Sequence, residues 1–156
     1  MEGKKVSESS VTHSHVMMPL DANQAGNVHG GLIMKHIDTT AGVVACRHAR
    51  KNVVTASLDR IDFFHPVYVG DLLTLKASLN FVGKTSMEIG VRVEAENLLK
   101  GKTLHTASAF LTFVALDENG LPTAVPPLIL LSDEEKRRNK AAKERKEMRL
   151  ALKGKE

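Results

Sequence analysis

The sequence predicts an α+β fold in which an antiparallel sheet of about five strands wraps around one long central helix. Three observations favour this fold: one segment with a helical apolar stripe, several segments with the two-residue period of strands, and short turns between them. The chain has 156 residues and 42% apolar composition, which suits one compact domain. Because aromatic residues make up only 4% and Trp is absent, aliphatic side chains must fill the core.

The predicted elements follow one another in a simple order. A first strand from Val11 to Met18 ends at Pro19, and residues 20–28 form a loop rich in Asp, Asn and Gly. From Gly30 to about His48 the apolar residues recur every three or four positions, which predicts the long helix; they are Ile33, Ile37, Ala41 and Val44. Four alternating segments then predict strands at 53–61, 73–81, 87–95 and 107–115. Short turns at 83–84 and 99–102 indicate antiparallel hairpins between the last three.

The positive charge is confined to the end of the chain. The net charge is +4, yet residues 1–131 hold twelve Lys or Arg and twelve Asp or Glu, whereas the segment from Ser132 holds ten and six. Mixed charges at helical spacing indicate a solvated helix or a disordered tail. A second hypothesis is that these cations meet the phosphates of a ligand. Nucleic acid is not expected as a partner, because a duplex-binding domain more often carries its basic face on the folded body.

The sequence lacks the features of several other classes of protein. Apolar runs such as Leu128 to Leu131 are far shorter than the roughly 18 residues of a membrane span, and no apolar segment of a secretory signal follows the first residues. We therefore expect a cytoplasmic protein. Cys46 lies near the end of an apolar helix, which predicts a small buried filler rather than a nucleophile. His13 and His15 share one face of a strand, but two histidines are weak evidence of metal, and no metal site is predicted.

Two adjacent glycines open the predicted helix, although glycine disfavours helices by about 1 kcal/mol relative to Ala. Without a Cβ at Gly30 and Gly31, a ligand can approach the backbone closely, and the N–H groups of a first helical turn have no helical partner. Such amides suit a carbonyl oxygen that gains negative charge during acyl transfer. The alternative is that the glycines only let a strand and the helix pack closely.

Asp38 places a carboxylate in the middle of the same helix. The residues that follow it, Thr39 to Gly42, are small and leave space for a substrate or a second helix. A carboxylate in such a place can take a proton from water or attack a carbonyl carbon itself. An exposed helical Asp without a catalytic role is the alternative.

Motifs that occur in order along the chain carry a resemblance to a known family. They are Asp21-Ala22-Asn23, Gly26 to Gly31, Met34 to Asp38 with Ala41-Gly42, Val54 to Asp59, Phe64 to Asp71, Lys84 to Ile89 and Ala107 to Phe110. This pattern, from about Val11 to Pro127, resembles the hot-dog-fold acyl-CoA thioesterases of the YciA and cytosolic acyl-CoA hydrolase type. The basic tail lies outside it. Some members of the family carry an aromatic residue where this chain has His29, so we expect that histidine to pack or orient rather than to catalyse.

The resemblance implies hydrolysis of the acyl-CoA thioester to free fatty acid and CoA, with no metal and no bound cofactor. It implies Asp38 as general base or nucleophile, Asn23 as its partner amide, and the backbone N–H of Gly31, with Gly30, as donors to the thioester oxygen. Further expected contacts to the CoA moiety are Ser57, Arg60, Lys84, Thr85 and Ser86. The domains expected are a flexible N-terminus at 1–10, the hot-dog thioesterase domain at 11–127 and the charged tail at 128–156. A non-hydrolytic acyl-CoA-binding protein or a hydratase-type hot-dog protein is the alternative.

The spacing of the site residues predicts a shared active site. Gly31 and Asp38 are seven residues apart, which is roughly 10 Å along a helix. One thioester carbon cannot easily reach both groups of a single chain, so two chains with antiparallel helices must supply them if they serve one reaction centre. A two-fold dimer meets this requirement and has two equivalent sites. The resemblance further implies a trimer of such dimers, a hexamer.

Overall fold

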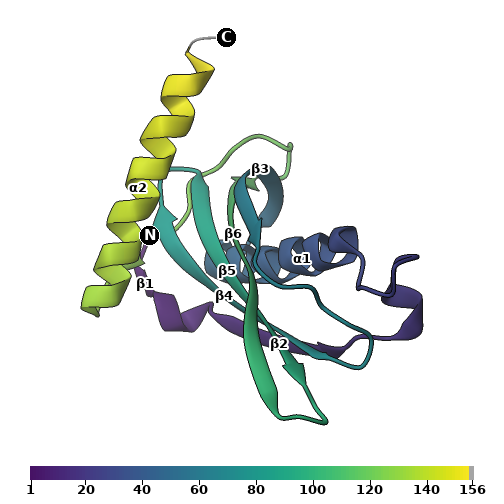
Figure 1. Cartoon of the computed structure of the whole chain (residues 1–156). Helices are drawn as coiled ribbons and strands as arrows, with labels where there is room; N and C mark the ends of the chain where they lie inside the picture. Colours follow the sequence, from purple (N-terminus) through teal and green to yellow (C-terminus); the bar gives the residue numbers. More distant parts are fainter. Residues whose placement is uncertain (155–156) are drawn as a thin grey trace.

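The computed structural model describes residues 1–154, and its main body is a five-stranded antiparallel sheet with a long helix on one face (Figure 1). The strands are β2 (Val11–Val16), β3 (Asn52–Phe63), β4 (Leu72–Val82), β5 (Ser86–Asn97) and β6 (Lys102–Leu116). Their order in the sheet is β2-β4-β5-β6-β3. The predicted sheet around one helix and the hairpins β4–β5 and β5–β6 are confirmed. Pairing of β3 with β6 puts β3 at an edge.

The long helix α1 (Gly30–Ala49) buries its predicted stripe against the sheet. Ile37, Ala41 and Val44 have no exposed surface, and Ile33 is 3% exposed. Opposite them lie the alternate residues of the central strands, such as Leu75 of β4. Complete burial of one such aliphatic side chain is worth roughly 1.5–3 kcal/mol, so this contact between helix and sheet holds the fold together.

The two ends of α1 are closed by local hydrogen bonds. At the start, the His29 side chain accepts a hydrogen bond from the Gly31 N–H. At the end, Arg50 takes a left-handed conformation with φ 51° and donates its N–H to the Cys46 carbonyl. Cys46 itself is exposed, so the prediction of a buried filler is wrong. Its position falls outside the stripe that faces the sheet.

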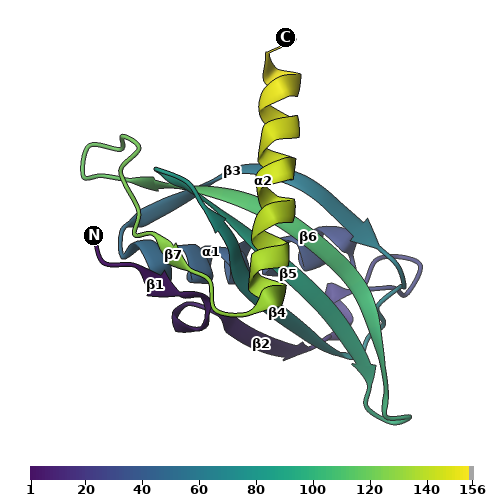
Figure 2. The same ribbon diagram turned by 90° about the vertical axis from the view of Figure 1, so that its left-hand side faces the viewer.

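The second long helix, α2 (Asp133–Lys153), lies on the other face of the sheet (Figure 2). Ser132 and Glu135 form a capping box at its start, which favours a helix over disorder. Of the two alternatives for the charged tail, the helix is confirmed, but it is not solvated on every side, because one side of α2 contacts β4 and its neighbours. Ala142 is fully buried, and the Arg145 guanidinium donates hydrogen bonds of 3.1 and 2.7 Å to the carboxylate of Glu88.

Short elements join the flanking segments to this body. β1 (Lys4–Lys5) pairs in parallel with β7 (Leu128–Ile129), and the 3-10 helices η1 (Val6–Glu8) and η2 (Pro19–Asp21) flank β2. Val6 is 7% exposed, so part of the first ten residues contributes to the interior. The domain boundaries at residues 10 and 127 stay predictions. No helix within residues 1–154 combines the length and the apolar character needed to cross a membrane.

Candidate active site

The carboxylate of Asp38 projects from the middle of α1 to the edge strand β3. The Thr55 hydroxyl of β3 donates a hydrogen bond of 2.6 Å to Asp38 Oδ1. Asp38 is exposed, and one of its two carboxylate oxygens has no partner in the part of the chain described here. The bond fixes the direction of the carboxylate and leaves Oδ2 open to a small molecule. Sequence reasoning did not single out Thr55, since its role depends on how β3 lies beside α1.

Asn23 lies in the loop that precedes α1 and organises that loop. Its Oδ1 accepts hydrogen bonds from the N–H groups of Ala25, at 2.9 Å, and Asn27, at 3.2 Å. Gly26, with φ +87°, makes the tight reversal between them. Asn23 is exposed, and its Nδ2 has no protein partner among residues 1–154. The amide can therefore donate to a water or to a carboxylate of another molecule.

The start of α1 offers one free backbone amide. The Gly31 N–H donates to His29 Nδ1 at 3.1 Å, whereas the Gly30 N–H has no partner in the described chain. A Cβ at Gly30 would meet nothing within 4 Å, so the space beside this amide is open. A bond of 2.8 Å from the His29 N–H to the Asp21 carbonyl ties the helix start to the Asn23 loop. The Gly30 N–H is therefore free to donate to an oxyanion. The Gly31 N–H could donate to the substrate only after its hydrogen bond to His29 Nδ1 breaks.

The two elements joined by the bond from Thr55 to Asp38 both carry exposed apolar side chains. Met34 is 43% and Val43 42% exposed on α1, and Val54 and Leu58 of β3 are each 42% exposed. Exposed apolar side chains on the helix that carries the carboxylate distinguish this surface from an ordinary solvated helix face. It fits a surface that a second molecule covers.

The expected CoA contacts divide into two groups. Ser57 and Arg60 lie in β3, near the irregular part of its pairing with β6. The Ser57 hydroxyl is buried and has no hydrogen-bond partner in the described chain. The Arg60 guanidinium forms an ion pair with the Asp62 carboxylate at 2.7 Å. The other three, Lys84, Thr85 and Ser86, lie at the β4–β5 turn. Within one chain no hydrogen bond or ion pair of the described residues joins either group to Asp38. Their substrate contacts stay predictions.

The side chains of His13, His15 and His36 form a row of ring contacts between β2 and α1, the first pair edge-on and the second tilted. The ring centroids are 4.1 Å apart for His13 and His15 and 4.6 Å apart for His15 and His36. Burial lowers the pKa of His36 from its usual value, and the neighbouring His15 and His13 act in the same direction. Between residues 1 and 154 no group of three or more His, Cys, Asp or Glu side chains is placed to hold a metal ion.

Comparison with known proteins gives the family. The model of the Thioesterase superfamily matches residues 25–102. An acyl-CoA thioester hydrolase of Bacillus subtilis, described as uncharacterized, is 41% identical over 128 residues, 82% of this chain and 74% of that protein. The cytosolic acyl coenzyme A thioester hydrolase of Rattus norvegicus is 39% identical over 92% of this chain, which spans 38% of that longer protein.

Solved structures agree over nearly the whole chain. An apo-hexameric acyl-CoA thioesterase has a TM-score of 0.94 at 39% identity, covering 97% of both chains. The acyl-CoA hydrolase of Staphylococcus aureus, in complex with butyryl coenzyme A, coenzyme A and coenzyme A disulfide, has a TM-score of 0.90 at 36% identity, covering 97% of this chain and 93% of that one. Further structures of that hydrolase replace an Asp, an Asn and a Thr by Ala. By sequence and by its hot-dog fold, this chain belongs to the thioesterase superfamily, among the acyl-CoA thioester hydrolases.

Proposed function

We propose that this protein hydrolyses the thioester bond of acyl-CoA to a free fatty acid and CoA. The observation that carries the proposal is the Asp38 carboxylate, which Thr55 holds in place on the same helix whose first turn presents a free glycine amide. The related proteins of Bacillus subtilis and Rattus norvegicus, both named as acyl-CoA thioester hydrolases, support the substrate class.

In this mechanism Asp38 acts on water or on the thioester itself. As a general base, it takes a proton through Oδ2 while the water oxygen forms a bond to the carbonyl carbon. The C–S bond then breaks, and CoA leaves as the thiol with the proton that Asp38 had accepted. As a nucleophile, Asp38 attacks the carbonyl carbon and expels CoA as its thiolate, and water then cleaves the resulting anhydride to the fatty acid and the free Asp38 carboxylate. Both routes need an open carboxylate oxygen, which the single Thr55 hydrogen bond leaves available.

The other residues would orient the reactants. Asn23 Nδ2 would donate to the water or to the carboxylate. The Gly30 N–H, with Gly31 if His29 is displaced, would stabilise the oxygen that becomes negative in the transition state. No cofactor is required for this chemistry, since carboxylate, amide and water supply every group that reacts.

The spacing of three residues in a related enzyme supports these assignments. In the Staphylococcus aureus hydrolase the replaced Asn and Asp lie 15 positions apart, and the Asp and the Thr lie 17 positions apart. Asn23, Asp38 and Thr55 have the same two spacings in this chain. The replaced trio of that enzyme therefore matches Asn23, Asp38 and Thr55 in residue type and in spacing.

We further propose that each active site combines two chains. Within one helix Gly31 and Asp38 are roughly 10 Å apart along the axis, so one thioester cannot contact both easily. The exposed apolar side chains of α1 and β3, among them Met34 and Val54, give a partner chain a surface to bury. A two-fold dimer with antiparallel α1 helices would bring the Gly30 end of one chain to the Asp38 of the other. The hexameric relative supports assembly of three such dimers.

Replacement of the carboxylate tests the activity. Asp38→Asn should reduce kcat by about 10² to 10⁴-fold, because the amide neither accepts the proton nor attacks the carbonyl. The measurement is thiol release from a series of acyl-CoA chain lengths. Asp133→Asn, at an exposed position on α2, is the matched control and should keep wild-type turnover. Wild-type turnover in Asp38→Asn would contradict the assignment.

The same assay separates hydrolysis from the alternative functions. A non-hydrolytic binding protein would take up acyl-CoA without releasing thiol, and a hydratase would consume enoyl-CoA with the thioester intact. Either result in the wild-type protein would replace the proposed function.

The related cytosolic hydrolase of Rattus norvegicus supports a cytoplasmic location, which cell fractionation would test.

Complementation tests the shared site. Asn23→Ala and Asp38→Ala chains, each nearly inactive alone, should regain roughly a quarter of wild-type activity when they are co-expressed in equal amounts. About half of the dimers are then mixed, and each mixed dimer has one intact site if Asn23 acts beside the Asp38 of the partner. Two differently tagged chains verify that subunits mix. Background activity despite proven mixing would rule out a site built from Asn23 and Asp38 of different chains.

A further inference from the structure

Strand β3 is irregular beside the candidate site. Its pairing with β6 shifts register twice within residues 55–60, and Ala56 and Asp59 are left without a partner in that register. Each is the extra residue of a β-bulge, which bends a strand and re-aims the side chains around it. Both follow Thr55, the donor to Asp38, by no more than four positions. The shape of β3 at the bulges therefore decides where the Thr55 hydroxyl lies.

The two bulges send Asp59 to the face of the sheet opposite Thr55. In a regular strand, residues separated by an even number of positions share a face, so Thr55, Asp59 and Ile61 would lie together. Thr55 does bond to Asp38 of α1, and Ile61 packs against the core that α1 covers. Asp59 instead accepts a hydrogen bond of 2.6 Å from Arg149 of α2, on the other face (Figure 2). The first bulge reverses the alternation and the second restores it.

The ion pair between Asp59 and Arg149 is shielded from solvent. Its side chains are 17% and 19% exposed, whereas Glu134 and Arg137, which pair within α2, are 49% and 66% exposed. Water and salt screen a shielded pair less than an exposed one, so its attraction is stronger. Asp59 and Arg149 thus form a firm contact between β3 and α2, although they lie 90 positions apart in the sequence.

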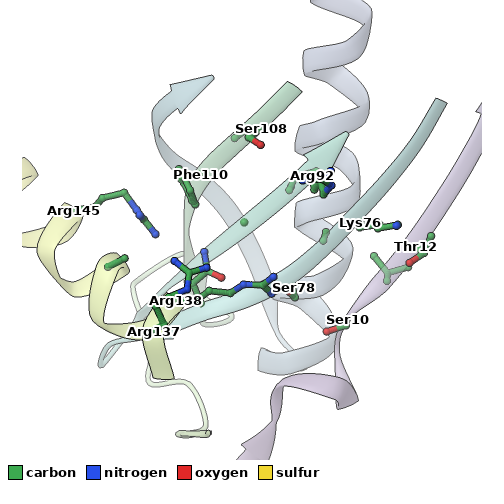
Figure 3. A pocket seen from close by; sticks show the side chains of 17 residues that line it. Ser10, Thr12, Lys76, Ser78, Arg92, Ser108, Phe110, Arg137, Arg138 and Arg145 are labelled. Atoms are coloured by element: carbon green, nitrogen blue, oxygen red, sulfur yellow. The ribbon is translucent and has the colours of Figure 1, made fainter. Parts of the chain in front are cut away.

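A second arginine makes α2 a bridge across β6. Arg145, four positions before Arg149 and on the same side of the helix, pairs with Glu88 of β5, and its Cζ atom lies 3.7 Å from the centroid of the Phe110 ring of β6. Figure 3 shows Arg145 and Phe110 at the polar groove between α2 and the sheet, with Arg145 extending from α2 toward the strands. Since β6 lies between β5 and β3, the two arginines hold the strands on either side of it. Through them α2 fixes the bulged edge strand relative to the centre of the sheet.

We propose that Asp59 and Arg149 are positioning residues, which hold β3 so that Thr55 orients the Asp38 carboxylate. Within residues 1–154, β3 pairs with β6 alone, and the bulges interrupt that pairing next to Thr55. The ion pair supplies a restraint that the strand pairing lacks there. A shift of Thr55 by about 1 Å would lengthen its 2.6 Å bond to Asp38 beyond hydrogen-bonding distance. This role rests on the proposed hydrolysis, and it lets α2 act on the site from the far face of the sheet.

Turnover of single and double variants tests the proposal. Arg149→Gln removes the charge-assisted hydrogen bond and should lower kcat for acyl-CoA by about 5-fold, with KM within about 2-fold, because the reacting groups are misplaced while the substrate contacts remain. Thr55→Val alone should lower kcat by about 10-fold. The double variant should stay close to Thr55→Val, since both changes act through one hydroxyl, whereas independent effects would multiply to about 50-fold.

Three further variants serve as comparisons. Asp59→Asn removes the other charge of the pair and should reproduce the kinetics of Arg149→Gln. Arg149→Lys keeps a cationic donor and should recover part of the lost rate. Lys140→Gln removes the same charge as Arg149→Gln from an exposed position of α2 and should keep wild-type kcat and KM.

Hydrogen–deuterium exchange gives a readout that needs no turnover. Arg149→Gln should speed amide exchange within residues 55–60 of β3 and leave β4 unchanged, while Lys140→Gln should match the wild type in both strands. A wild-type protein that releases no thiol from acyl-CoA would contradict the proposed hydrolysis, and faster exchange in β3 would still show that Arg149 holds this strand. Turnover and exchange therefore separate failure of the proposed function from failure of the positioning role.

Three results would overturn the proposal. The first is an Arg149→Gln variant with wild-type kcat and unchanged exchange in β3. The second is a raised KM with unchanged kcat, which would make Arg149 a contact of the substrate. The third is a double variant about 50-fold slower than the wild type, which would show that Arg149 acts independently of Thr55.

Discussion

The two faces of the sheet hold their helices by different means. On the inner face, α1 buries an aliphatic stripe against alternate residues of the strands, and Ile37 has no exposed surface. On the outer face, α2 is held by directional contacts: Arg145 to Glu88, Arg149 to Asp59 at 2.6 Å, and Asn139 Nδ2 to the Asn80 carbonyl.

This difference separates two tasks within one domain. Apolar burial is non-directional and supplies most of the stability, so the inner face forms the core that positions Asp38. Ion pairs add less net stability because both partners lose water, but their geometry is specific. The outer face can therefore carry charge and a polar groove while the inner face keeps the fold. Substitutions on the two faces should differ accordingly.

The largest effect on stability is expected at the inner face. Ile37→Ala should reduce the free energy of unfolding by about 2–5 kcal/mol, since it leaves a cavity between α1 and the sheet. Thermal denaturation at matched protein concentration measures the change. Met148→Ala, at a side chain that is 69% exposed on α2, is the control and should shift Tm little. Equal decreases in Tm for both variants would contradict the proposed difference in how the two helices are held.

A smaller loss is expected at the outer face. Arg145→Gln leaves the Glu88 carboxylate, in a residue only 4% exposed, with Asn80 as its remaining partner and should cost about 2 kcal/mol. The double variant Glu88→Gln/Arg145→Gln removes the buried charge as well and should recover part of the loss. Comparison of the two Tm values checks this. A double variant less stable than Arg145→Gln would show that the ion pair is not the main contact of α2.

The hydrogen bond from Thr55 of β3 to Asp38 of α1 should affect catalytic activity more than stability. Thr55→Val removes the donor to Asp38 Oδ1 and should lower kcat by about 10-fold, because the carboxylate loses its fixed direction. Thr55→Ser keeps the hydroxyl and should recover most of the rate. Thiol release and Tm are measured for both. If Thr55→Val and Thr55→Ser have the same kcat, the Thr55 hydroxyl has no role in positioning Asp38.

The smallest effect is a dependence of stability on pH at the end of α1. His48 is buried, its Nε2 lies 2.7 Å from the Pro126 carbonyl, and burial lowers its pKa from 6.5. The unfolded chain therefore binds a proton more readily, so the stabilising contribution is complete above pH 6.5 and is lost as the pH falls below it. Tm should drop less between about pH 7.5 and 5.5 in His48→Gln than in the wild type. His65→Gln, at an exposed position, is the control; an unchanged slope in His48→Gln would exclude His48 as the source.

Much of the fold could be predicted because its signals are local. The stripe at Ile33, Ile37 and Val44 repeats with the helical period and marks the face of α1 that meets the sheet. The alternation in β4, β5 and β6 has the period of strands, and short turns force neighbours into antiparallel pairs. Asp38 and the glycine pair were also visible, because a carboxylate in an apolar helix and glycines at its start contradict local propensity.

The sequence by itself therefore determined the five main strands, the helix α1, the apolar face of each and the candidate carboxylate. Only the tertiary structure decided which distant groups meet. Thr55 reaches Asp38 because β3 pairs with β6 at the sheet edge, and Arg145 reaches Glu88, 57 positions away, because α2 docks on the outer face. The physical reason is that periodicity records which side of an element is apolar, whereas pairing across long stretches of chain depends on the free energy of the whole fold.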